Sequence, residues 1–181
     1  MVWNRMFGKK KKDEALDPFQ DLVLSKLKVG YLVDYDMNTW EVTEYNMYDW
    51  DDGDYSYEWE LTSGNQVLYL EREEDDEVEW VLTKRISFNS LGAGISKYIE
   101  QNEDPPHELE YEGVKYYLDD GSGGYLCKGG GKQRIEFLYW EFLDKSEEKV
   151  LTIEQWGEDK FEASVGIYVE EYQFTNILPK A

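Results

Sequence analysis

Two halves of the chain carry the same alternating apolar pattern, and this repeat constrains the fold more than any other feature. The stretch 57–61 (YEWEL) recurs in altered form at 139–142 (YWEF). Anchors align at offsets of 81 to 83 residues: Gly30 with Gly113, Asp36 with Asp119, Trp59 with Trp140, Glu71 with Glu154, and Glu79 with Glu162. Apolar residues between these anchors recur at every second position, which is the period of one strand face. The pattern predicts a duplicated β unit; the alternative is a chance register between two alternating segments.

Turn residues divide both halves into short strands. We expect strands at 30–36, 39–47, 55–61, 66–72, 78–86, 109–111, 114–119, 124–128, 133–143, 149–155, 160–170 and 171–177, with loops at 119–124, 129–131 and 144–148. Such spacing is typical of a mainly β protein with antiparallel strands, either a sandwich or small barrels. The halves either form two small domains or pack together about a pseudo-two-fold axis. The linker between the halves holds apolar residues, which favours the arrangement in which the two halves pack together.

The predicted organisation has five segments. They are a basic and aromatic tail (1–12), an N-terminal helix (13–26), the first β repeat (27–88), a linker with a short helix (89–107), and the second β repeat (108–181). Asp17-Pro18 is a plausible start for the first helix, since proline is tolerated in the first turn.

The formal charge of −21 is unevenly distributed. Residues 1–12 hold five basic residues and no acid, while the remainder holds 14 basic and 40 acidic residues. A body this acidic repels phosphate backbones, so we expect no nucleic-acid partner. It would attract a basic protein or peptide, a polyamine or another cation. An aromatic content of 16% is too high for a disordered chain.

The first residues combine apolar anchors with a basic run. Such a segment can dock on an anionic membrane surface, and the residues predicted to do so are Trp3, Met6, Phe7, Lys9, Lys10, Lys11 and Lys12. No apolar run approaches the roughly 20 residues that span a bilayer. The single cysteine, Cys127, excludes an intrachain disulfide, and we expect it to be buried. We therefore predict a cytoplasmic protein. Peripheral docking at the inner membrane is one option for its first residues; the alternatives are a solvated terminus or docking on another protein.

No catalytic set is visible, so we expect no enzyme and no cofactor. His107 is the sole histidine and no nucleophile elbow is present, which leaves a serine or cysteine nucleophile without a base. The glycines at 129–131 lack the spacing of a phosphate-binding loop. The acidic loop offers only weak metal candidates, and no metal site is predicted: Asp49, Asp51, Asp52 and Asp54.

Acidic and aromatic residues on the strands are the candidate site. Glu60 and Glu141 are expected on the strand faces opposite Trp59 and Trp140, where they could act as an acid and base pair or simply face solvent. The predicted ligand or partner surface comprises Tyr57, Glu60, Glu71, Glu79, Glu141, Glu154 and Glu162.

Several of these motifs resemble one bacterial family. They are the stretch 27–30 entering a strand, Trp40-Glu-Val42, Trp59-Glu60, Leu68-x-Leu70-Glu71 and Glu79-Trp80. Together they resemble the domain of unknown function family numbered 4178, clearest over residues 26–88, with the second half similar to a diverged copy. The resemblance implies no activity. It implies a loose link to polyamine synthesis and membrane stress, since members are said to be encoded near such genes.

Two functions follow from these features. The first is a non-enzymatic cytoplasmic binding or adaptor protein that presents an acidic β surface. The alternative is a small-molecule or cation binder, with a polyamine or calcium held in a cleft between the halves.

Overall fold

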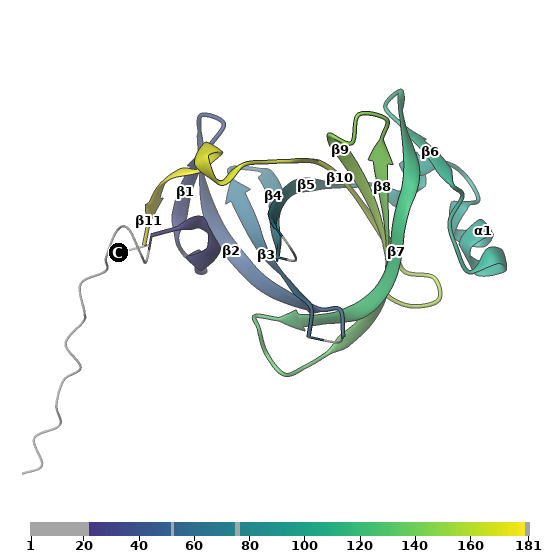
Figure 1. The fold of residues 1–181 in the computed structure, drawn as a ribbon, viewed down its shortest axis with the longest axis horizontal. Coiled ribbons are helices and arrows are strands. Elements are labelled where there is room, and N and C mark those ends of the chain that lie inside the picture. The colour runs from purple at the N-terminus through teal and green to yellow at the C-terminus, as the bar shows by residue number, and fades with distance from the viewer. Residues whose placement is uncertain (1–21, 52, 75–76, 180–181) are drawn as a thin grey trace, which may run out of the picture.

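The computed structural model describes residues 22–51, 53–74 and 77–179. These residues form one antiparallel sheet of eleven strands (Figure 1). The strands are β1 (Leu32–Tyr35), β2 (Asn38–Asp49), β3 (Tyr55–Ser63), β4 (Gln66–Glu74), β5 (Val78–Ile86), β6 (Glu108–Tyr111), β7 (Val114–Lys128), β8 (Ile135–Asp144), β9 (Lys149–Gln155), β10 (Phe161–Tyr168) and β11 (Thr175–Leu178). The mainly β, antiparallel prediction is confirmed.

Eight of the strands close into a ring. The pairing order β2-β3-β4-β5-β10-β9-β8-β7 returns to β2, because β2 also pairs with β7 over 46–49 and 125–128. The other closing seam joins β5 to β10. Strands β1 and β11 extend the sheet beside β2, and β6 extends it beside β7. The two sequence halves therefore share one continuous sheet, and Figure 1 shows the ring seen along its opening.

The glycine-rich segment 119–124 is part of a strand, which makes the predicted loop wrong. Strand β7 runs through it and pairs with β8, interrupted by an irregularity at Asp119. Its glycines permit close contacts: a Cβ on Gly124 would lie 2.9 Å from the Asp49 carbonyl oxygen, and one on Gly121 would lie 3.0 Å from the Trp140 ring. Glycine in this strand allows another backbone or a large ring to approach, so a glycine-rich stretch is not by itself a sign of a loop.

The short helices lie outside the ring. They are η1 (Leu24–Lys26), η2 (Phe88–Leu91), α1 (Ile95–Asn102) and η3 (Glu171–Gln173). The short linker helix is confirmed as α1. The predicted N-terminal helix ends in the described residues as one 3-10 turn, and its residues 13–21 lie outside them. The predicted closing strand at 171–177 is a 3-10 turn followed by β11.

Two apolar clusters cover the outer faces of the ring. The first surrounds Trp59 and Leu61 and is covered by Leu24 of η1 and by Val169 and Phe174 of the C-terminal segment. Trp59 is 2% exposed, and its indole Nε1 donates to the Leu27 carbonyl at 3.0 Å. These contacts fix the N-terminal segment against the sheet.

The second cluster gathers the matching residues of the other half. Trp140 and Phe142 pack with Ile95 and Ile99 of α1 and with Leu109 of β6. Trp140 is 4% exposed, so it is buried in its half as Trp59 is in the first. Because strand side chains alternate, the residues between these tryptophans and their apolar neighbours point to the inside of the ring.

Candidate functional site

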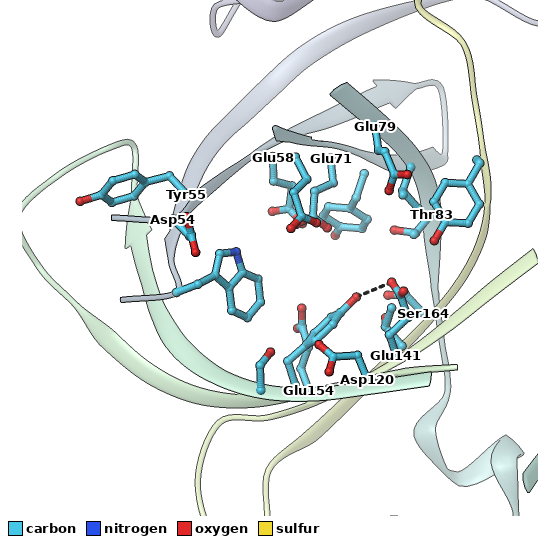
Figure 2. Close-up of a pocket in the computed structure, with 18 of the residues that line it drawn as sticks. Asp54, Tyr55, Glu58, Glu71, Glu79, Thr83, Asp120, Glu141, Glu154 and Ser164 are labelled. Carbon is cyan, nitrogen blue, oxygen red and sulfur yellow. Dashed lines mark hydrogen bonds between the residues drawn. The ribbon is translucent and has the colours of Figure 1, made fainter. Parts of the chain in front are cut away.

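The interior of the ring holds a cavity of about 320 Å³. Its described lining is dominated by carboxylates, with nine acidic residues against one basic residue. The acids are Asp54, Glu58, Glu71, Glu73, Glu74, Glu79, Asp120, Glu141 and Glu154, and the base is Arg85. In Figure 2, Glu58 and Glu71 point into the cavity from one wall, and Asp120, Glu141 and Glu154 from the opposite wall.

The first wall carries two adjacent carboxyl groups, of which Glu58 is buried and Glu71 is half-buried. Glu58 of β3 and Glu71 of β4 are directly opposite each other in the strand pairing. Glu58 accepts hydrogen bonds from the Asn46 side-chain amide at 3.0 Å and from the Tyr48 hydroxyl at 3.3 Å. Glu71 accepts one from the Ser56 hydroxyl at 2.7 Å. Like charges placed directly across a strand pair are destabilising, so this pair is costly when both groups are ionised.

The opposite wall is built by β8 and β9. Tyr139 donates its hydroxyl to Glu141 at 3.0 Å, the interaction drawn as a dashed line in Figure 2. Glu154 is the register partner of Tyr139 and accepts a hydrogen bond from the indole of Trp156 at 3.2 Å. Thr152, the register partner of Glu141, is also buried. Both walls thus present carboxyl groups supported by hydrogen-bond donors of the sheet.

Burial changes the protonation of these carboxyl groups. Removal from solvent is the largest cause and raises the pKa of Glu71 to about 8, although the hydrogen bond from Ser56 lowers it. Desolvation likewise raises the pKa of Glu154 to about 7, with a further increase from the charge of Glu58. The pKa values of Glu58 and Glu141 are raised by the same cause. Part of the interior charge is therefore neutralised by protons near pH 7.

One end of the cavity is aromatic. A third apolar cluster, centred on Tyr48, Leu126 and Phe137, fills the ring where β2 meets β7. Trp50 and Tyr139 pack against this cluster and also line the cavity, with their ring centroids 5.4 Å apart. The cavity consequently offers carboxylates on its walls and flat π surfaces at one end.

Sequence reasoning found part of this site. Four of the seven predicted surface residues line the cavity: Glu71, Glu79, Glu141 and Glu154. Glu60 and Glu141 do lie on the faces opposite Trp59 and Trp140, but Glu60 is outside the lining and accepts a hydrogen bond from Thr43 at 2.6 Å. The acid and base pair of these two residues is therefore not assembled in the cavity.

The remaining candidates lie elsewhere. Tyr57 packs on the outer face beside Tyr45, and Glu162 forms an ion pair with Arg85. Among the weak metal candidates, Asp49 and Asp51 bind Arg134 at 3.2 and 3.0 Å, Asp54 lines the cavity, and Asp52 is outside the described residues. The described parts of the chain contain no group of three potential metal ligands. Cys127 is buried, as predicted.

The predicted membrane-docking residues, Trp3 to Lys12, lie outside the described residues. In the part of the chain that the structure describes, no helix has the length and apolarity needed to cross a membrane.

Sequence reasoning missed Glu58, Arg85 and Tyr139 as site residues. Glu58 and Glu60 flank Trp59 in the sequence, so both are expected on the strand face opposite Trp59 and the sequence does not distinguish them. Choosing between them requires knowing which part of β3 faces the enclosed interior. Arg85 carries no local signal, because its role depends on the β5–β10 seam.

Comparison with known proteins finds one family whose sequence model covers most of the closed sheet. The sequence model of the family described as domain of unknown function DUF4178 matches residues 28–171, so the chain belongs to that family. The match runs across both halves. An uncharacterized protein of Aquifex aeolicus (strain VF5) is 27% identical over 157 residues, which cover 87% of this chain and 85% of that protein. No solved structure matches the chain.

Proposed function

We propose that this protein binds a small, positively charged organic molecule inside the ring. The observation that carries the proposal is the pair of facing walls, with Glu58 and Glu71 on one side of the cavity and Glu141 and Glu154 on the other. This arrangement supports the cation-binding alternative from the sequence over the adaptor. The adaptor role, the cytoplasmic location and the membrane docking stay predictions from the sequence.

Buried carboxylates that face one another need compensation. Ionised groups removed from water are costly unless they are paired with an opposite charge. Arg85 is the one basic side chain among the described lining residues, and Glu162 already pairs with it. Without a ligand, protons neutralise part of the set, as the raised pKa values of Glu71 and Glu154 indicate. A cationic ligand would replace those protons.

The aromatic end of the cavity favours an organic cation. Ammonium groups and the methylene groups beside them bind to the faces of tryptophan and tyrosine rings. Trp50 and Tyr139 provide such faces next to the carboxylates. A volume of about 320 Å³ also lies within the size range of small-molecule sites. Polyamines combine both properties, with several ammonium groups joined by methylene chains.

The rim of the cavity would guide such a ligand inward. Asp54, Glu73, Glu74, Glu79 and Asp120 line the cavity and are exposed, whereas Glu58 is buried at 8% exposure. Carboxylates that continue from an exposed rim to a low-dielectric interior focus the field and raise the local concentration of cations.

Isothermal titration calorimetry at low salt tests the proposal. We would titrate putrescine, spermidine and tetramethylammonium, with the neutral compound butanediol for comparison, and expect saturable binding of the amines alone. The double variant Glu71→Gln/Glu154→Gln should weaken binding at least about tenfold, since a glutamine cannot release a proton and pair with the bound cation. Glu136→Gln is the matched control, because Glu136 is an exposed residue of β8 outside the lining. Absence of binding by every cation, or equal affinity in the double variant, would refute the proposal.

We also infer that the two four-stranded meanders, β2–β5 and β7–β10, are copies of one unit. Each follows a short strand and a turn with positive φ, at Asp36-Met37 and at Glu112-Gly113. Each first strand has a register irregularity, at Thr43 in β2 and at Asp119 in β7.

This correspondence differs from the sequence alignment near the start. The structural correspondence matches β2 with β7, so Val42 corresponds to Leu118. The sequence anchors instead pair Gly30 with Gly113, and these glycines precede strands that do not correspond, β1 and β7. An experimental structure is the test. If β2–β5 cannot be superposed on β7–β10 about a two-fold axis, the duplication is wrong.

A further inference from the structure

We infer that Arg85 is a specificity-determining residue of the cavity, a built-in cation that sets how much positive charge a ligand can carry. The inference rests on the proposed function and extends it to the selection among ligands. It assigns to one side chain a role that the carboxylates alone do not explain.

Arg85 is held in the lining by contacts with two neighbouring strands. It belongs to β5 and is the register partner of Ser164 in β10, so it lies at the seam between the two meanders. Its guanidinium forms an ion pair with Glu162 of β10. On the other side its central carbon lies 4.9 Å from the ring centroid of Tyr69 in β4. A carboxylate and an aromatic face together orient the group, which is how a bound cation would also be held.

The charge of Arg85 reaches the carboxyl groups of both walls. It lowers the pKa of Glu58 on the first wall and of Glu154 on the second, although burial has the larger and opposite effect on each. It also lowers the pKa of Tyr69 against the dominant effect of desolvation. One guanidinium therefore acts on the same carboxylates that would bind the ligand.

A ligand that enters the cavity meets this positive charge. Its ammonium groups are attracted by the wall carboxylates and repelled by Arg85, and the repulsion grows with the number of ligand charges. The side chain of Arg85 is 41% exposed, so solvent screens the interaction and each ligand charge is affected modestly. The result is a filter that disfavours ligands of high charge relative to an otherwise identical cavity without Arg85.

Replacing the charge with a neutral side chain tests the filter. Arg85→Gln should tighten binding about threefold for the monoammonium ligand butylamine, about tenfold for putrescine and about thirtyfold for spermidine. The affinity gain is multiplied about threefold for each added ligand charge, because the electrostatic energy is proportional to that charge. Arg85→Lys keeps the positive charge and should bind all three amines within about twofold of wild type.

Arg134→Gln is the matched control. Arg134 is 44% exposed, pairs with Asp49 and Asp51, and stacks 3.8 Å from the ring centroid of Tyr125, but it does not line the cavity. Its removal should leave the three affinities unchanged. Glu162→Gln is a second, opposite test, since it leaves Arg85 unpaired and should weaken binding more for spermidine than for butylamine.

The outcomes separate this inference from the proposed function. If wild type binds the amines and Arg85→Gln binds them equally, the inference is overturned and the proposed function stands. An equal tightening for all three amines would also overturn it, because a loosened structure rather than charge would be the cause. If Arg85→Gln does not fold, the double variant Arg85→Gln/Glu162→Gln is compared with Glu162→Gln, because these two proteins differ only in the charge of residue 85. If neither wild type nor variants bind any amine, the proposed function fails and the inference fails with it.

Discussion

Glu58 and Glu71 are register partners on neighbouring strands, and both carboxyl groups face the interior of the closed ring. Burial raises the pKa of both groups, for Glu71 to about 8. Side-chain donors from Asn46, Tyr48 and Ser56 hold the pair in place. Two acids directly opposite each other on neighbouring strands lower the free energy of unfolding when both are ionised.

The pH dependence of stability should be inverted relative to that of a protein with salt-bridged acids. The folded pKa values of Glu71 and Glu154, about 8 and about 7, lie above their ordinary value of 4.5. Between these limits the folded state binds more protons than the unfolded state, so the free energy of unfolding falls as pH rises. We expect a decrease of about 2 kcal/mol or more from pH 5 to pH 8, measured by urea unfolding. A rise over this interval would contradict the assignment.

Removing the charge of Glu71 should stabilise the protein at high pH. Glu71→Gln keeps an acceptor for Ser56 and cannot ionise, so at pH 8 the free energy of unfolding should increase by about 1 to 3 kcal/mol. At pH 5 the difference should be small, because the carboxyl of wild type is protonated in the fold. The exposed Glu136→Gln serves as the control and should show no such dependence on pH. Destabilisation at pH 8 would show that the ionised group is favourable.

Gly166 should be required for the β5–β10 seam. A Cβ at this position would lie 2.3 Å from the Leu82 carbonyl oxygen, which is backbone and cannot move aside easily. Gly166→Ala should therefore reduce the free energy of unfolding by about 2 kcal/mol or more. Gly123→Ala is the comparison, since its Cβ would meet the flexible end of Leu138 at 3.3 Å and should cost less. Thermal unfolding followed by tryptophan fluorescence measures both, and equal losses would argue against a tight seam.

Trp59 should be the most costly residue of the first apolar cluster to replace. Trp59→Ala removes a fully buried ring and should destabilise by about 3 to 5 kcal/mol. Trp59→Phe keeps most of the packing but leaves the Leu27 carbonyl without its donor, and should cost about 1 to 3 kcal/mol. Tyr57→Ala, at a half-buried neighbour on the same face, should cost less than Trp59→Ala in the same chemical unfolding experiment. The reverse order would place the centre of the cluster elsewhere.

Several features of this protein could be read from its sequence. Alternation at every second residue located most strands, and it placed Glu60 and Glu141 opposite the buried Trp59 and Trp140. Strand periodicity is a local property, since each side chain points away from its neighbours whatever the strand pairs with. The repeat also points to Glu71 and Glu154, which occupy matching positions in the two halves, and both line the cavity.

Only the tertiary structure decided what these faces enclose. The seams between β5 and β10 and between β2 and β7 join residues that are far apart in the sequence, and no local pattern specifies such partners. Closure of the ring brings Glu58 and Glu71 to face Glu141 and Glu154. It also brings Arg85 into the lining of the same cavity. The sequence by itself determined that the chain is acidic and built from alternating strands. The closed sheet determined that part of this acidity is buried in one cavity, because burial depends on pairings that only the whole fold defines.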